Sequence, residues 1–221
     1  MKTVIFDADG TLVDSVYFFI EAYHNAYRHF GLSINRSRIQ KVIGMGCDKA
    51  IPSLTSAEWY KEHGIDLRRR AVEIYKGTFL PRVELFPKAQ ESCMRLKSLG
   101  LSLALASSSS SDIVDHYLGL FSHNNIFDFV NTSTDNIRTK PDPDIFLDIL
   151  KKGKFSTNSS LVIGDSIWDI RASRQANLKC ICVLTGGYHS EVLRKEGAAE
   201  IYEDVEELLG KLNDSIIMKV R

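Results

Sequence analysis

Two carboxylates, Asp7 and Asp9, directly follow a short apolar run at residues 3–6 in the opening stretch MKTVIFDADGTLVDS. A carboxylate can attack phosphorus and form an acyl-phosphate, which divides one difficult displacement into two easier steps. A second carboxylate two residues further on can give a proton to the departing oxygen and later take one from water. The stretch therefore predicts Asp7 as a nucleophile and Asp9 as a general acid and base, although Asp-Gly is also a common turn signal.

Other polar groups follow later apolar runs in the same way. A run of serines that begins at Ser107 and the pair Asp165 and Asp169 each come after such a run, and Lys140 stands just before a helical pattern. Taken alone, each group has an ordinary explanation as a helix cap, a first-turn acid or a solvated surface lysine. In an open parallel sheet, however, ligands bind beyond the carboxyl ends of the strands. We therefore expect all these groups to converge at one edge of a sheet.

A cluster of carboxylates at one place needs a cation, because the charges repel one another. Oxygen ligands suit Mg²⁺, which keeps several waters and uses few carboxylates. Together with a lysine, hydroxyl groups and amides at helix starts, such an ion favours a phosphate-bearing ligand. We therefore expect a magnesium ion and a small phosphorylated metabolite at the four acids Asp7, Asp9, Asp165 and Asp169.

The apolar runs that position these groups alternate with helical patterns. Strands are expected at residues 3–6, 101–106, 127–130, 160–164 and 179–184. Helices are expected at residues 87–100, 111–121, 143–153 and 169–178, followed by a last strand and helix within 199–212. This alternation predicts an α/β protein with a doubly wound, Rossmann-like parallel sheet as its core.

One long stretch interrupts the alternation. Residues 16–83 show helical patterns and no convincing strand. The stretch is long enough for a small helical domain, and it lies between the first strand and the next strand–helix unit. We therefore expect a core domain of residues 1–15 and 84–221, with an inserted helical cap domain at 16–83.

Composition excludes some classes of function. The 221 residues include 28 basic and 28 acidic side chains, so the formal net charge is zero and gives no support for binding nucleic acid or an anionic membrane. No apolar run approaches the roughly 20 residues of a membrane-spanning helix, and Asp7 interrupts the first run too early for a signal peptide. The four cysteines form no CxxC pair, as expected of a reduced interior. We expect a cytoplasmic protein, monomeric or homodimeric.

These residues resemble the motifs of the haloacid dehalogenase superfamily, and specifically its capped phosphatases of the phosphoglycolate phosphatase and β-phosphoglucomutase type. The matching stretches, in order along nearly the whole chain, are DADGTLVDS (7–15), LALASSS (103–109), KPDPDIF (140–146) and IGDSIWDIRASRQAN (163–177). The resemblance implies a magnesium-dependent phosphoric monoester hydrolase that acts through an aspartyl-phosphate. Its substrate would be a small phosphomonoester, with phosphoglycolate or a sugar phosphate as examples.

The resemblance also implies a role for each residue. Asp7 would be the nucleophile and a magnesium ligand, and Asp9 would bind the metal through its backbone carbonyl. Asp165 would be a further metal ligand, and Asp169 a ligand or the partner of one. Ser107 and Lys140 would contact the transferring phosphoryl group, and Ser108 is expected to bind substrate beside them.

The stretch IGMGCDKAI (43–51) resembles the substrate-specificity loop of the family's cap. It implies Gly46 and Lys49 as substrate-binding residues, although a plain turn between two helices would read the same way. A cap lysine such as Lys49 also raises the possibility of phosphonate chemistry through a Schiff base, but Lys140 occupies the place where such enzymes usually carry arginine.

Three further alternatives stay open. Dehalogenases of the superfamily lack the second aspartate of the first motif, so Asp9 argues against that reaction. Mutases often carry glutamate where Gly164 precedes Asp165, and an arginine near the place of Cys47, so hydrolysis is favoured over mutase activity. A non-catalytic phosphate-binding module is the third alternative, and occupied catalytic positions argue against it.

Overall fold

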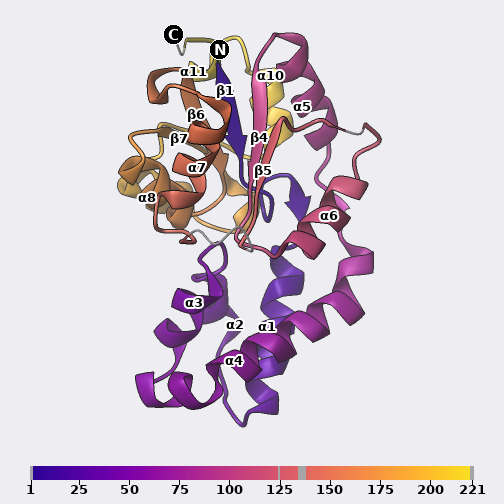
Figure 1. Ribbon diagram of the computed structural model, residues 1–221, viewed down its shortest axis with the longest axis vertical. Helices are drawn as coiled ribbons and strands as arrows, with labels where there is room; N and C mark the ends of the chain where they lie inside the picture. The colour runs from indigo at the N-terminus through magenta and orange to yellow at the C-terminus, as the bar shows by residue number, and fades with distance from the viewer. Residues whose placement is uncertain (1, 124, 134–137, 220–221) are drawn as a thin grey trace.

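A six-stranded parallel sheet forms the upper half of the molecule in the computed structural model, which describes residues 2–123, 125–133 and 138–219 (Figure 1). The strand order is β5-β4-β1-β6-β7-β8, so the order reverses at β1. The strands are β1 (Thr3–Phe6), β4 (Ser102–Ala106), β5 (Phe129–Asn131), β6 (Ser160–Gly164), β7 (Lys179–Val183) and β8 (Glu200–Tyr202). A reversal of this kind opens a crevice at the carboxyl ends of the strands, where ligands of such sheets bind.

Helices cover both faces of the sheet, which explains why its strands are almost continuously apolar. Side chains alternate along β1, so Val4 and Phe6 pack into the hydrophobic cluster under α5, α6 and α10, whereas Ile5 packs into the cluster under α7 and α8. The core helices are α5 (Ala89–Ser98), α6 (Ser111–Gly119), α7 (Asp144–Gly153), α8 (Ile167–Gln175), α9 (Ser190–Glu196), α10 (Val205–Gly210) and α11 (Ile216–Lys219). There are also two short 3₁₀ turns. The turn η3 (Thr157–Ser159) directly precedes β6, and the turn η4 (Leu184–Gly186) directly follows β7. The predicted doubly wound α/β core is confirmed.

Several predicted boundaries differ from the structure by one to three residues, and two of these differences have a clear local cause. The strand expected at 127–130 begins at Phe129, because Phe127 turns into the core and packs edge-on against Phe6 and Phe121. The helix expected from residue 169 begins earlier, at Ile167, because Ser166 caps it in a capping box with Asp169.

The lower half of the molecule is a cap of helices with its own hydrophobic cluster, built around Tyr27, Ile39, Ile51 and Leu67 (Figure 1). Its elements are α1 (Val16–His29), α2 (Arg36–Gln40), α3 (Cys47–Leu54), α4 (Ala57–Ile74), a π-helical turn η1 (Tyr75–Phe79) and a 3₁₀ turn η2 (Leu80–Arg82). As predicted, this stretch of the described chain contains helices and no strand.

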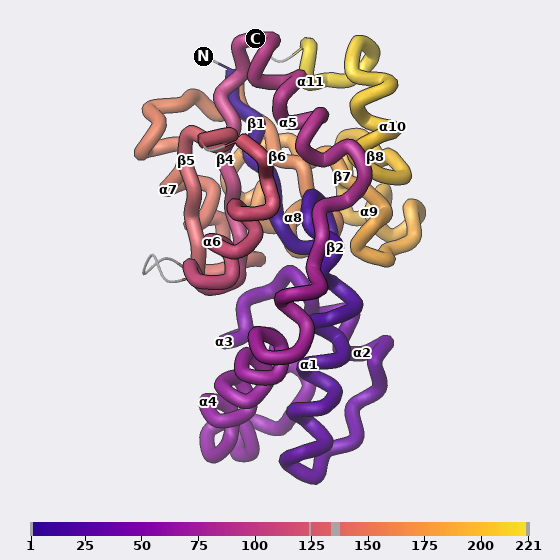
Figure 2. The backbone as a smooth tube through the Cα atoms, turned by 90° about the vertical axis from the view of Figure 1, so that its right-hand side faces the viewer, coloured from indigo at the N-terminus to yellow at the C-terminus, as the bar shows by residue number. Residues whose placement is uncertain are grey.

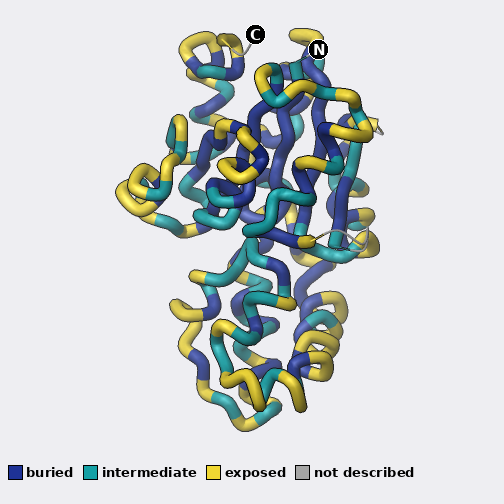
Figure 3. The backbone as a smooth tube through the Cα atoms, turned by 60° about the vertical axis from the view of Figure 1, so that its left-hand side comes forward, coloured by how far each residue is buried: buried dark blue, intermediate teal, exposed yellow. Residues whose placement is uncertain are grey.

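The cap and the sheet are joined by two connections that run side by side (Figure 2). These connections form a small antiparallel pair, β2 (Val13–Asp14) with β3 (Glu84–Leu85), which the sequence did not predict. Buried residues concentrate along the sheet and along the inner sides of the cap helices (Figure 3). None of the helices in the described ranges is long and apolar enough to cross a membrane.

Candidate active site

Asp7 and Asp165 follow the carboxyl ends of two adjacent strands, β1 and β6. The amide of Asp7 donates to the carbonyl of Ile163 at 2.8 Å, which continues the pairing of the two strands by one residue. Lys140 is fully buried beside Asp7 and Asp169. Its Nζ donates to Oδ1 of Asp7, forms an ion pair with Oδ1 of Asp169 at 2.8 Å and donates to the Ala106 carbonyl at 3.1 Å. The structure thus brings together acids and a lysine that are far apart in the sequence.

Three of the acids form a group that could hold a metal ion. Asp7, Asp165 and Asp169 each offer one carboxylate oxygen, and these oxygens lie within 4.8 Å of one another. Oδ2 of Asp7 is buried and receives no hydrogen bond from the described residues. Two glycines leave room for the Asp165 carboxylate. A Cβ on Gly10 would lie 2.5 Å from Oδ2 of Asp165, and a Cβ on Gly186 would lie 1.8 Å from the same atom. Three neighbouring carboxylates, one of which has an oxygen without a hydrogen bond from the described residues, are oxygen ligands that suit Mg²⁺.

The acids are strongly perturbed by burial and by one another. Burial raises the pKa of Asp7 to about 7, although the Lys140 ammonium opposes the rise and Asp169 adds to it. Burial also raises the pKa of Asp165 well above its usual range, and repulsion from Asp169 and Asp7 adds to this rise. Burial alone would lower the pKa of Lys140, but the carboxylates of Asp169 and Asp7 more than offset it and raise that pKa. A divalent cation would replace the protons that these carboxylates otherwise retain.

The carboxylate of Asp9 is not part of this group of three acids and is held by four hydroxyls. They belong to Ser15 at 2.6 Å, Tyr117 at 2.6 Å, Ser109 at 2.9 Å and Ser107 at 3.3 Å. The Asp9 side chain is therefore occupied by these hydroxyls, and the predicted contact of its backbone carbonyl with a metal stays a prediction. Reasoning from the sequence missed Ser15, Ser109 and Tyr117 as partners of Asp9.

The serine loop after β4 reaches both the site and the cap. Ser107 is fully buried, and its Oγ accepts a hydrogen bond from the Ser109 amide at 3.0 Å. Ser108 donates to the carbonyl of Gly44, in the cap loop, at 3.2 Å. The structure thus places Ser107 beside Asp9, and Ser108 at the boundary between core and cap.

Gly46 and Lys49 lie where the cap meets the loop that carries Lys140. Nζ of Lys49 donates to Oδ2 of Asp142 at 2.7 Å and to the Thr139 carbonyl at 2.6 Å, and the Gly46 amide donates to the Lys140 carbonyl at 3.2 Å. A Cβ on Gly46 would lie 1.7 Å from Oγ1 of Thr139, so only glycine fits this approach. Both residues contact the core rather than line the pocket described next, and their contact with substrate stays a prediction.

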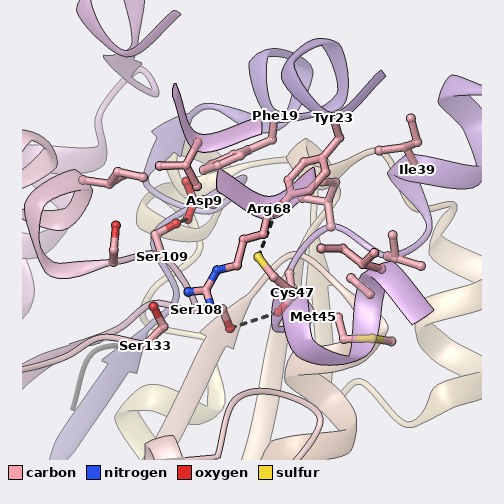
Figure 4. A pocket seen from close by; sticks show the side chains of 18 of the residues that line it. Asp9, Phe19, Tyr23, Ile39, Met45, Cys47, Arg68, Ser108, Ser109 and Ser133 are labelled. Atoms are coloured by element: carbon pink, nitrogen blue, oxygen red, sulfur yellow. Dashed lines mark hydrogen bonds between the residues drawn. The ribbon is translucent and has the colours of Figure 1, made fainter. Parts of the chain in front are cut away.

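A pocket lies between the cap and the strand ends (Figure 4). Its core side carries Asp7, Asp9, Ser108 and Ser109, and its cap side is formed by α1, α3, α4 and the loop around Met45. The candidate nucleophile, the candidate acid and the cap therefore line one pocket, and a cap in this position can limit the access of water.

Residues 4–183 of this chain match the model of a protein family described as "haloacid dehalogenase-like hydrolase". The match covers most of the chain, and the chain belongs to this family. The resemblance inferred from the four motifs is confirmed.

Two of the named relatives are similar over nearly their full length. The chain is 28% identical to the phosphoglycolate phosphatase of Vibrio cholerae over 216 residues, which cover 95% of this chain and 96% of the relative. It is 25% identical to a phosphorylated carbohydrates phosphatase of Thermotoga maritima over 214 residues, which cover 97% and 99% of the two chains. A solved hydrolase from Pseudomonas syringae is similar with a TM-score of 0.90 and 31% identity, over 97% of this chain and 99% of that one.

Proposed function

We propose that this hydrolase is a magnesium-dependent phosphatase that cleaves a small phosphomonoester through an aspartyl-phosphate on Asp7. The observation that carries the proposal is the clustering of Asp7 with Asp165 and Asp169, together with Lys140, which forms ion pairs with both Asp7 and Asp169. The names of the relatives, which include phosphatases of phosphoglycolate and of carbohydrates, support the same reaction class.

In the first step, a carboxylate oxygen of Asp7 attacks phosphorus and the bond from phosphorus to the ester oxygen breaks. The Asp9 carboxyl gives its proton to that oxygen, and the alcohol departs. Asp9 is suited to this task because it lines the same pocket as Asp7, where a bound ester would lie. Lys140 stays protonated beside Asp7 and would stabilise negative charge on the transferring group.

In the second step, Asp9 takes a proton from water and the water oxygen attacks phosphorus of the aspartyl-phosphate. The bond to the Asp7 oxygen breaks, inorganic phosphate leaves and Asp7 returns to its carboxylate form. The hydroxyls of Ser107 and Ser109 donate to Asp9 and would hold it in position for this proton transfer.

Mg²⁺, when bound by Asp7, Asp165 and Asp169, would neutralise the charge of the acids and of the phosphoryl group. The segment 16–83 would act as the cap that excludes water and selects the leaving group. Hydrogen bonds from Trp168 and Tyr188 to the Lys41 carbonyl, at 3.1 and 2.9 Å, support a cap that seats directly on the core.

The experiment that tests this function is release of inorganic phosphate from a panel of phosphomonoesters, with magnesium and with a chelator. The panel includes phosphoglycolate, hexose phosphates and p-nitrophenyl phosphate, and Asp7→Asn serves as the control. We expect release that needs magnesium and is lost in the variant. Release that persists with the chelator or in Asp7→Asn would contradict the proposal, and isomerisation of a hexose phosphate without release would indicate a mutase.

A further inference from the structure

We infer that Lys49 of the cap is a positioning residue for the reaction and that it acts through Lys140. The inference rests on the proposed phosphatase function, and it gives a role to the contact between the cap and the loop at residues 139–142. The start of α3 holds this loop, and the loop carries the lysine that stabilises the transferring group. The cap thus contributes to phosphoryl transfer itself, in addition to covering the site.

The ammonium of Lys49 joins the two ends of a turn in this loop. Within the turn, the Asp142 amide donates to the Thr139 carbonyl at 3.1 Å. Nζ of Lys49 donates to the same carbonyl at 2.6 Å and forms an ion pair with Oδ2 of Asp142 at 2.7 Å. The paired side chains are 30% and 26% exposed, so water screens them less than a pair in full contact with solvent. The cap lysine therefore binds the loop on both sides of Lys140.

Two further contacts join the start of α3 to the same loop. The Gly46 amide donates to the Lys140 carbonyl at 3.2 Å, and Oδ1 of Asp48 accepts a hydrogen bond from Oγ1 of Thr139 at 2.9 Å. A Cβ on Gly46 would stand 1.7 Å from Oγ1 of Thr139, so the two segments are in direct contact. Together with Lys49, these groups fix the backbone at and around Lys140 from the cap side.

The backbone of the loop determines where the Lys140 ammonium lies. This side chain is fully buried, and its Nζ contacts the carboxylates of Asp7 and Asp169. The core also holds the loop, since Nε2 of Gln175 in α8 donates to the Pro141 carbonyl at 2.7 Å. A shift of about 1 Å in a catalytic group can lower a rate about 10²-fold. Loss of the cap's contacts with the loop should therefore slow phosphoryl transfer.

This role differs from substrate binding, which the resemblance to the family's specificity loop implies for Lys49. A lysine that binds the alcohol part of the ester would affect some esters more than others and would not depend on Asp142. A lysine that positions the loop affects every ester equally, and loss of its partner Asp142 has an effect of the same kind. The two acceptors of the Lys49 ammonium both belong to the loop, which favours positioning.

Steady-state kinetics of the magnesium-loaded protein test the inference. The variants are Lys49→Met, Asp142→Asn, the double variant of these two, and Lys49→Arg, which keeps the charge. Lys76→Met is the matched control, because Lys76 forms a second ion pair between cap and core, with Asp112 of α6 instead of with this loop. Melting temperatures show whether each variant is folded.

Two esters and one inhibitor are used with every variant. The esters are p-nitrophenyl phosphate and the phosphomonoester of the panel that the wild type cleaves fastest. The inhibitor is orthovanadate, which mimics the transferring phosphoryl group in its transition state. Vanadate carries no alcohol part, so its inhibition constant reports on the groups around the phosphoryl site and not on recognition of the leaving group.

We expect Lys49→Met to lower kcat and kcat/KM equally, by about tenfold to a hundredfold, on both esters. The inhibition constant of orthovanadate should rise with it, because Lys140 stabilises the group that vanadate mimics. Asp142→Asn should show a smaller loss of the same kind, since the Thr139 carbonyl still accepts from Lys49. The double variant should lose no more than Lys49→Met. Lys49→Arg and Lys76→Met should stay close to the wild type.

Three results would overturn the inference while leaving the phosphatase function intact. Unchanged kcat and vanadate inhibition in Lys49→Met would show that the loop does not need the cap. A rise in KM for one ester only, with Asp142→Asn unaffected, would assign Lys49 to substrate binding. An equal loss in Lys76→Met would trace the effect to the seating of the whole cap. Absence of p-nitrophenyl phosphate hydrolysis by the wild type would instead count against the proposed function.

Discussion

The Tyr117 hydroxyl donates a hydrogen bond to Oδ1 of Asp9 across 2.6 Å, and both residues are buried. Burial and the adjacent Asp9 raise the pKa of Tyr117, so the phenol keeps its proton and remains a donor. The Tyr75 hydroxyl lies 2.6 Å from that of Tyr117, and the Tyr75 ring stacks on Phe19 of α1 with centroids 3.9 Å apart. Because Tyr75 opens the π-helical turn that leads out of the cap, the position of Asp9 is tied to the link between cap and core.

Tyr117→Phe should therefore slow the cleavage of esters with poor leaving groups. The variant keeps the ring and its packing but removes one of the hydroxyls that orient Asp9, and we expect kcat for an alkyl phosphate to fall about tenfold. The loss for p-nitrophenyl phosphate should be smaller, because that leaving group needs little protonation. Tyr75→Phe, which leaves the contact between Tyr117 and Asp9 in place, is the matched control. Equal losses on both esters would show that Tyr117 does not act through Asp9.

Asp165→Asn should weaken magnesium binding without unfolding the protein. Removing the charge of one of three clustered acids should raise the magnesium concentration for half-maximal activity by roughly tenfold or more, since even partners of metal ligands affect affinity at this level. The thermal shift produced by magnesium should shrink in parallel, which gives a readout independent of turnover. Asp148→Asn, which changes a surface ion pair with Lys152, is the control. An unchanged magnesium titration in Asp165→Asn would remove this residue from the metal site.

The raised pKa of Asp7 predicts a pH dependence of metal-free stability. The pKa of this group rises from an ordinary 3.8 to about 7 in the folded chain, so the folded state binds more protons than the unfolded state between these values. The free energy of unfolding contributed by Asp7 therefore falls as the pH rises from about 4 to about 7. Thermal melts in a chelator should show this fall in the wild type and less of it in Asp7→Asn, which cannot ionise. A wild type and variant with parallel pH profiles would contradict the prediction.

Magnesium should reverse this trend, because metal and protons compete for the same carboxylates. The stabilisation by magnesium should increase between pH 6 and pH 8, as the pKa of about 7 for Asp7 requires. Calorimetric titration with magnesium alone at several pH values measures both the affinity and the protons released. Affinity that is independent of pH would mean that the metal does not replace protons at Asp7.

The positions of the strand-end acids could be predicted because the strands that precede them are visible as local apolar runs. β1 and β6 are continuous apolar runs with the bounds expected, and Asp7 and Asp165 follow them directly. The carboxyl ends of parallel strands lie at the same edge of the sheet, so the parallel topology alone brings these residues together. Strand β5 was placed less well, because Phe127 belongs to the core through contacts with Phe6 and Phe121 that no local pattern reveals.

The partners that complete the site could not be predicted from the sequence. Tyr117 and Tyr75 stand at helical positions whose periodicity indicates ordinary core residues, and their hydroxyls meet only through packing of segments 42 residues apart. Arg68 is the first of three consecutive arginines, which point in different directions around a helix, and no local pattern distinguishes one from the others. The packing of α4 against α1 and α3 decides which of them enters the pocket.

The central claim is that the phosphoryl group passes through Asp7, and trapping the intermediate tests it most directly. Asp9→Asn should slow hydrolysis of the intermediate roughly 10²–10⁴-fold, because general acid–base catalysis contributes about that much. Rapid acid quench of this variant during turnover of p-nitrophenyl phosphate, followed by peptide mass spectrometry, then locates the phosphoryl group. We predict phosphorylation of the N-terminal peptide at Asp7, absent from the Asp7→Asn, Asp9→Asn double variant. A phosphoryl group on another residue, or one that persists in the double variant, would contradict the account.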